Sequence, residues 1–140
     1  MGDTQVRSRS QFHRWLYERT GGRLGRRLVN NDMLLLTTEG RVSGQPHTVP
    51  LLYLEDGVNL VVIASYGGRD RAPSWYLNLL AKPGVEVQVG PDRFRATART
   101  ADAEERARWW PQAVSAYADY AVYQSRTKRE IPIVFLEPVI

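Results

Sequence analysis

The chain has 140 residues, of which 43% are hydrophobic and 24% are charged, and this size and composition predict one globular domain with its own core. It contains no cysteine, which excludes a disulfide framework, a thiol nucleophile and a cysteine-based metal centre. No apolar run approaches the roughly 18 residues that a membrane-spanning helix needs, and no signal-peptide core follows the basic start. We therefore expect a cytoplasmic protein.

The net charge of +4 is concentrated near the N-terminus, where residues 1–30 hold seven arginines and two acidic residues. A nucleic-acid-binding protein more often spreads its positive charge over a folded face, so we expect no nucleic-acid partner. Phe12, Trp15 and Leu16 recur at helical spacing among these arginines. Residues 1–30 are therefore predicted to form a basic amphipathic segment that either contacts an anionic membrane surface peripherally or remains a solvated flap.

Beyond residue 30 the pattern changes to that of short strands. Asp56-Gly57 and Gly90-Pro91-Asp92 each predict a tight hairpin between two alternating segments. Because proline cannot donate to a strand ladder, Pro50 should lie at a bulge or at a sheet edge. Six segments combine apolar or alternating residues with bounding turn residues, and they are residues 33–38, 47–55, 58–65, 85–90, 93–100 and 131–138.

Two helices are expected among these strands. Pro73-Ser74 opens a helix of about two turns, which Pro83-Gly84 ends. Asp102 and Glu105 have the spacing of a capping box at the start of a second helix. Pro111 either kinks that helix or begins a new segment.

So few helices cannot cover both faces of a flat sheet, which favours a sheet that closes on itself. We therefore predict an α+β fold that is mainly β. In it, residues 31–140 form a split β-barrel of about six antiparallel strands with flanking helices.

Common catalytic motifs are missing from the sequence. The only histidines are His13 and His47, and neither belongs to a metalloprotease HExxH helix or accompanies a GxSxG nucleophile elbow. A P-loop and a GxGxxG fingerprint are also missing. The sequence therefore lacks the residues that metal-assisted hydrolysis or a serine triad would require.

Four segments instead combine small, polar and aromatic residues in ways that core packing does not require. The loop 37–47 places Arg41 and Ser43 between two glycines, a pattern typical of an anion-binding turn or of a polar hairpin loop. Residues 64–68 put small side chains at a strand end, where a flat ligand could approach the backbone or the chain could simply turn. Residues 73–79 begin a helix whose free amides favour an anion, although its large apolar side chains are typical of a core.

The fourth segment contains three tyrosines at three-residue intervals. On one helix or 3₁₀ turn their rings and hydroxyls would share a face, either as a substrate wall or as an aromatic core stripe. These residues are Tyr117, Tyr120 and Tyr123.

Together the four segments resemble the deazaflavin-dependent nitroreductase family. The residues that carry the resemblance are LLLTTEGRVSGQPHTVPLLYLEDG, VIASYGGRDRAPSWYLNLLAKPGVEVQVG and ADAEERARWWPQAVSAYADYAVYQSRTKREIPIVFLEP, which span nearly all of residues 33–138. The resemblance implies a split β-barrel related to flavin-mononucleotide-binding oxidoreductases. It also implies that the protein binds coenzyme F-420, a 5-deazaflavin with a phosphate and a polyglutamate tail.

The resemblance also implies which residues bind the coenzyme. The family's phosphate loop, following strand, ring-lining strand end and pocket-closing helix fall on Arg41, Val42, Ser43, His47, Thr48, Val49, Pro50, Leu51, Leu52, Ile63, Ala64, Ser65, Tyr66, Ser74, Trp75, Tyr76, Leu77 and Asn78. Family members commonly carry basic residues where this chain has Val42, His47 and Tyr66, which leaves Arg41 as the main cation of the loop.

The catalytic residues implied by the resemblance are Ser65 near the ring and Tyr117, Tyr120 and Tyr123 on the substrate side, with Tyr120 also touching the coenzyme. The expected reaction is hydride transfer from the reduced deazaflavin to a flat, electron-poor acceptor such as a quinone, nitroaromatic or enone. Two alternatives are an oxidoreductase of the same barrel that uses FMN, and a deazaflavin-binding or storage module without turnover.

Overall fold

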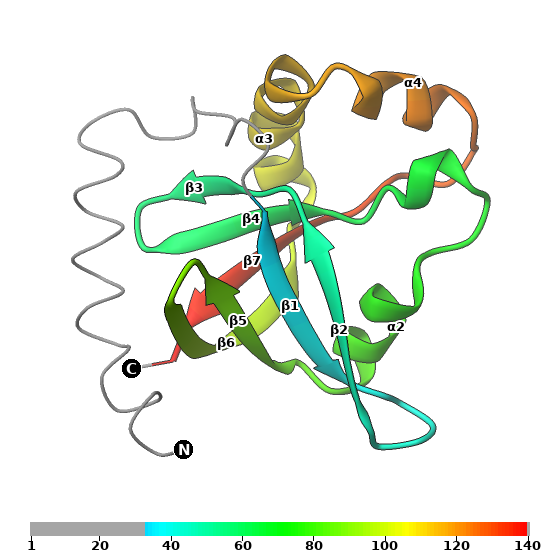
Figure 1. The fold of residues 1–140 in the computed structure, drawn as a ribbon. Helices are drawn as coiled ribbons and strands as arrows, with labels where there is room; N and C mark the ends of the chain where they lie inside the picture. Colours follow the sequence, from blue (N-terminus) through cyan, green and yellow to red (C-terminus); the bar gives the residue numbers. More distant parts are fainter. Residues whose placement is uncertain (1–32, 140) are drawn as a thin grey trace.

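The computed structural model describes residues 33–139. Its core is one seven-stranded antiparallel sheet with the strand order β2-β1-β5-β6-β7-β4-β3. The sheet curls into a barrel whose two edge strands, β2 and β3, are not paired with each other (Figure 1). The strands are β1 (Leu34–Glu39), β2 (Pro46–Leu51), β3 (Leu54–Asp56), β4 (Asn59–Ile63), β5 (Gly84–Val89), β6 (Asp92–Thr100) and β7 (Ile133–Pro138).

Four helical segments lie outside the strands. A 3₁₀ turn, η1, follows β4, and α2 contacts β1 and β6, whereas α3 and α4 lie together at the opposite end of the barrel (Figure 1). Their bounds are η1 (Tyr66–Gly68), α2 (Ser74–Ala81), α3 (Ala103–Ala116) and α4 (Asp119–Ser125). The predicted mainly β split barrel with flanking helices is confirmed, with seven strands in place of about six.

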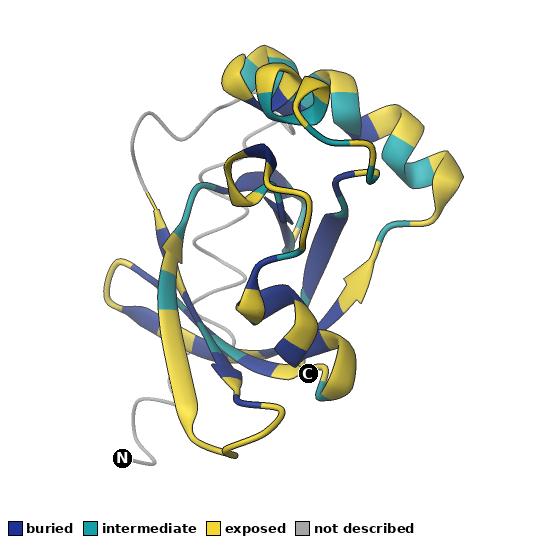
Figure 2. Cartoon of the chain, turned by 90° about the vertical axis from the view of Figure 1, so that its right-hand side faces the viewer, coloured by how far each residue is buried: buried dark blue, intermediate teal, exposed yellow. Residues whose placement is uncertain are grey.

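Two apolar cores hold these layers together. The larger fills the barrel interior under α2, and the smaller lies between the outer face of β4 and β7 and the helices α3 and α4. β4 contributes to both because Leu60 and Val62 face the first core and Val61 faces the second. In the second core, the rings of Trp109 and Phe135 meet edge to face with centroids 6.3 Å apart. Figure 2 shows the buried strands enclosed by more exposed helices and edges.

The expected single strand over residues 47–55 is wrong. The chain leaves β2 after Leu51 and re-enters the sheet as β3 at Leu54, so β2 pairs with β1 and β3 pairs with β4 at the other edge. A continuous strand could not reach both edges of the curled sheet, and the break at residues 52–53 supplies the corner. The Asp56-Gly57 hairpin is confirmed, but only for the short β3. Pro50 lies on the edge strand β2, where a missing donor is tolerated.

The local helix signals agree with the structure. α2 begins at Ser74, and the capping box of α3 forms because Glu105 N donates to Asp102 Oδ1 at 2.9 Å while Asp102 N donates to Glu105 Oε1 at 3.0 Å. Pro111 lies inside α3, so it does not begin a new segment. The predicted basic segment, residues 1–30, lies outside the described residues.

Within residues 33–139, no helix is both long enough and apolar enough to cross a membrane.

Candidate functional site

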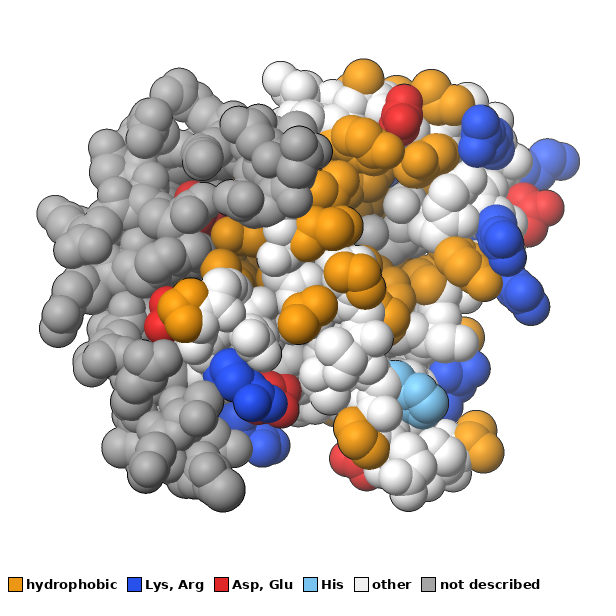
Figure 3. All heavy atoms as spheres, viewed as in Figure 1, with side chains coloured by type: hydrophobic (Ala, Val, Ile, Leu, Met, Phe, Trp, Pro, Cys, Tyr) orange, Lys and Arg blue, Asp and Glu red, His pale blue; other side chains and the backbone are white. Residues whose placement is uncertain are grey.

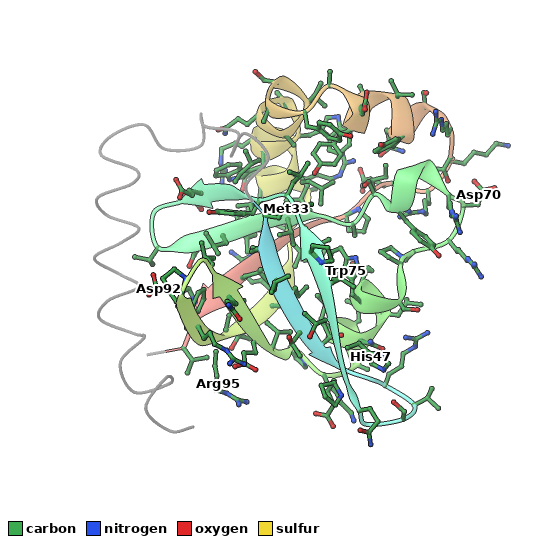
Figure 4. The ribbon with its side chains drawn as sticks, viewed as in Figure 1. Met33, His47, Asp70, Trp75, Asp92 and Arg95 are labelled. Atoms are coloured by element: carbon green, nitrogen blue, oxygen red, sulfur yellow. The ribbon has the colours of Figure 1, made fainter. Side chains whose placement is uncertain are left out.

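A pocket of about 600 Å³ opens where the loop after β1, the first half of β2 and the start of α2 meet. Trp75 lies between β2 and α2, above His47 on β2 (Figure 4). The pocket combines hydroxyl, amide, guanidinium and aromatic groups, so it offers both polar and flat apolar contacts. It is lined by Gly40, Arg41, Val42, Ser43, Pro46, His47, Thr48, Val49, Ser74, Trp75 and Asn78.

The loop over residues 40–45 is held by its own hydrogen bonds. Gly40 N donates to Gln45 O at 2.8 Å, Gly44 N donates to Gly40 O at 2.9 Å, and Gln45 N donates to Ser43 Oγ at 3.1 Å. The amides of Val42 and Ser43 donate to no other described residue. Two backbone donors therefore remain at the tip of the loop, where Val42 is 93% exposed.

Gly40 lies closely against the side chains of Ser43 and His47. A Cβ on Gly40 would lie 2.7 Å from Ser43 Oγ and 2.8 Å from His47 Nε2, distances that real side chains do not adopt. A side chain at this position would therefore displace the side chains of Ser43 and His47. The imidazole of His47 and the Ser43 hydroxyl lie together at the pocket wall.

Arg41 is tied to α2. Its Nη1 donates to Asn78 Oδ1 at 2.7 Å and to Ser74 O at 3.4 Å, and its backbone N donates to Asn78 Oδ1 at 3.1 Å. Among the described residues, no carboxylate forms an ion pair with Arg41. The guanidinium thus keeps its full charge and free N–H groups beside the pocket, which suits bidentate binding of a phosphate or carboxylate.

The start of α2 adds further donors. Tyr76 N and Leu77 N both donate to Pro73 O, so the amides of Ser74 and Trp75 remain at the open end of the helix. The first turn contains no acidic residue and no side-chain cap. The positive end of the helix dipole therefore reinforces the charge of Arg41 and favours an anion at this end of the pocket.

A second group of predicted residues lies outside this pocket, at the end of β4. Arg129 donates to Ala64 O at 3.4 Å, to Ser65 O at 3.0 Å and to Arg69 O at 2.8 Å, so one side chain fixes the backbone of the predicted ring-lining strand end. Arg126 in turn donates to Gly67 O at 3.2 Å. The sequence showed no signal for Arg129, because its partners lie 60 to 65 residues away.

The three tyrosines meet, although not on one helix. Tyr117 is the C-cap residue directly after α3, whereas Tyr120 and Tyr123 belong to α4. Their ring centroids are 5.0 Å apart for Tyr117 and Tyr120 and 6.4 Å apart for the other two pairs, and the hydroxyls of Tyr117 and Tyr123 are 3.5 Å apart. The expectation of a single shared helical face is wrong, since the chain breaks between α3 and α4, but the clustering it implied is present.

The three tyrosines of this cluster differ in how far they are buried. Tyr120 is 7% exposed and packs in the second core, while Tyr117 and Tyr123 are half-buried against it. Burial, with a smaller contribution from Tyr123, raises the pKa of Tyr120 to about 12. Hydrogen bonding to Tyr123 and Asp119 raises the pKa of Tyr117. Both phenols are therefore protonated at neutral pH and can donate a hydrogen bond.

The structure thus brings nine of the nineteen predicted coenzyme residues into one pocket, and the other ten lie outside its lining. Tyr76 is buried with its hydroxyl 2.8 Å from that of Thr100, and Leu77 lies on the outer side of α2. Gly40 and Pro46 line the pocket without having been predicted, although the loop that contains them was. The predicted residues that do not line it are Pro50, Leu51, Leu52, Ile63, Ala64, Ser65, Tyr66, Tyr76, Leu77 and Tyr120.

Comparisons with known proteins identify a family. The family model for F420H(2)-dependent quinone reductase matches residues 8–138. An F420H(2)-dependent quinone reductase of Mycobacterium tuberculosis (strain ATCC 25618 / H37Rv) is 42% identical over 130 residues, which cover 90% of this chain and 87% of the relative.

Solved structures agree with this match. An F420-H2 dependent reductase (FDR-A) is 41% identical with a TM-score of 0.70, covering 79% of this chain and 98% of that one. A Listeria innocua protein named for pyridoxamine 5'-phosphate oxidase shares the fold at 15% identity, with a TM-score of 0.55 over 79% of this chain and 86% of that one.

Proposed function

The chain belongs to the F420H(2)-dependent quinone reductase family, and from this premise we propose that the pocket between the 40–45 loop, β2 and α2 binds coenzyme F-420. The observation that carries the proposal is Arg41, an arginine without a carboxylate partner among residues 33–139, held beside unpaired backbone amides. These donors match the phosphate and acidic tail of the coenzyme. Trp75 and Val49 supply the apolar walls that a flat ring system requires.

When bound, the reduced deazaflavin supplies a hydride, and the protein contributes binding and orientation. The pocket-lining residues hold the anionic end of the coenzyme, while Arg129 keeps the backbone of Ala64 and Ser65 in place at the predicted ring side. The tyrosine cluster is proposed to face the acceptor. Its protonated hydroxyls can donate to negative charge that develops on an acceptor oxygen.

The acceptor class proposed for this chain is a quinone, in line with the names of its family and relatives. Nitroaromatics and activated enones share the flat, electron-poor character that such a site accepts, and we propose them as further substrates. The family match favours F-420 over FMN as the cofactor.

Anaerobic mixing tests this function against both alternatives. Protein mixed with reduced F-420 and a soluble quinone should regenerate the absorbance of the oxidised coenzyme. A protein that instead retains FMN and turns over with it would contradict the F-420 assignment. If the protein bound F-420 but reduced no quinone, nitroaromatic or enone, it would be a storage module.

We predict that the tyrosine hydroxyls govern turnover more than coenzyme binding. Tyr120→Phe and Tyr123→Phe should each lower kcat/KM for a quinone by roughly tenfold or more, because a donor to developing charge acts only in the transition state. Coenzyme affinity, measured by fluorescence titration, should change less than about threefold. If either variant lost thermal stability while keeping its rate, the tyrosines would be an aromatic core stripe, as the burial of Tyr120 alone would suggest.

The basic N-terminal segment supports a second proposal, that a cytoplasmic protein contacts the membrane peripherally where lipid-soluble quinones reside. Residues 1–30 combine a net charge of +5 with several large apolar side chains. Full-length protein should co-sediment with vesicles that contain anionic lipid, and protein lacking residues 1–30 should remain in the supernatant. Equal sedimentation of the two proteins would make the segment a solvated flap.

A further inference from the structure

Asn78 is a buried polar side chain between the pocket and the barrel core. It lies in the second turn of α2 and is 3% exposed, next to the apolar Leu79. The side-chain amide connects three elements, because it bonds to Arg41 in the loop and to Thr38 on β1. A polar group in this position is stabilising only if its hydrogen bonds are satisfied.

The acceptor capacity of Asn78 is used entirely by Arg41. Oδ1 has two lone pairs, and they receive the backbone N of Arg41 at 3.1 Å and its Nη1 at 2.7 Å. Nδ2 donates to Thr38 Oγ1 at 3.1 Å, so the donor side of the amide faces β1 while its oxygen faces Arg41. Asn78 therefore cannot accept a hydrogen bond from a bound ligand, and its contacts fix the position of the Arg41 guanidinium.

We propose that Asn78 is a positioning residue that sets coenzyme affinity through Arg41. This inference rests on the proposed function, in which Arg41 binds the anionic part of F-420. An arginine side chain has several rotatable bonds, and ordering it in advance reduces the entropic cost of ligand binding. An amide is suited to this task because it orients the guanidinium without offsetting its charge, whereas a carboxylate would form an ion pair and weaken the attraction for a phosphate.

A double-mutant cycle tests the inference. F-420 binding is titrated by fluorescence for the wild type, Asn78→Ala, Arg41→Ala and the double variant. Asn78→Ala should weaken binding about tenfold in the wild-type background and less than about twofold in the Arg41→Ala background, because the two residues act as one unit. Equal losses in both backgrounds would overturn the inference while leaving the proposed function intact. If Arg41→Ala bound F-420 as the wild type does, both the anion site and the inference would be wrong.

Two further variants separate positioning from stability. Thr38→Val removes the buried hydroxyl that Nδ2 contacts but keeps the bonds to Arg41, so it should lower the melting temperature and leave F-420 affinity within about twofold. Asn78→Asp keeps the shape and the acceptors of the side chain and places a negative charge beside the guanidinium. It should weaken binding about tenfold and flatten its dependence on salt concentration. Wild-type affinity and salt dependence in Asn78→Asp, or loss of affinity in Thr38→Val equal to that in Asn78→Ala, would overturn the inference.

Discussion

Arg41→Ala should weaken the binding of coenzyme F-420 by about 1.5–3 kcal/mol, the scale of a charge-assisted hydrogen bond. The loss should be of this size because Arg41 is the only cation that lines the pocket within residues 33–139. Val42 and His47, which line the same wall, supply no fixed positive charge. The backbone amides of the loop and of α2 would remain, so binding should be weakened and not abolished.

Fluorescence titration at two salt concentrations measures this effect. The wild type should lose affinity as salt is raised, and Arg41→Ala should lose less, because screening acts on the interaction that the substitution removes. Arg93→Ala is the matched control: Arg93 is an exposed arginine that pairs with Glu86 at 3.2 Å and lies outside the pocket. Unchanged affinity in Arg41→Ala, or an equal loss in Arg93→Ala, would contradict the assignment of the anion site.

The features that sequence reasoning predicted well are those that depend on neighbours in the chain. The capping box of α3 needs only Asp102 and Glu105, and the start of α2 needs only the Pro73-Ser74 pair. The loop between β1 and β2 was also identified from its own glycines and polar residues. Its cation, Arg41, does lie in the pocket wall.

The features that were missed depend on contacts between distant residues. Alternation continues smoothly from β2 into β3, and only the need to reach opposite edges of the sheet divides them. The bond between Asn78 and Arg41 spans 37 residues, and those of Arg129 to Ala64 and Ser65 span 65 and 64 residues. In these cases the residue type is compatible with many roles, and tertiary packing selects one.

The two proposed parts of the site, the pocket at the start of α2 and the tyrosine cluster at α4, lie on one side of the molecule. In Figure 3, apolar side chains gather in the middle of the face, and several Lys and Arg side chains lie along its right-hand edge. Figure 4, in the same view, places His47 at the lower right. α4 with its tyrosines lies at the top of the same view, and α2 lies below it at the right (Figure 1). η1 lies between β4 and α2 in the chain and contacts α4, and its residue Gly68 determines how closely η1 and α4 can approach each other.

Gly68 permits a direct contact between η1 and α4. A Cβ at this position would lie 2.5 Å from Tyr123 O and 2.9 Å from Tyr123 Cα, and both of these are backbone atoms that cannot rotate away. Gly67, the preceding residue, has a similar positive φ of 63° but no atom within 4 Å of such a Cβ. The two glycines therefore share the backbone conformation that disfavours side chains, and they differ in the steric contact with α4.

Gly68→Ala should consequently lower the free energy of unfolding by about 2–4 kcal/mol, whereas Gly67→Ala should cost about 1 kcal/mol from backbone strain alone. To relieve the clash, α4 must move away from η1 and carry Tyr123 with it, so kcat/KM for a quinone should fall in Gly68→Ala and remain near the wild-type value in Gly67→Ala. Urea denaturation and steady-state kinetics with reduced F-420 measure the two effects. Equal losses of stability and rate in both variants would show that backbone conformation is the whole requirement, and that the packing of η1 against α4 does not position the tyrosines.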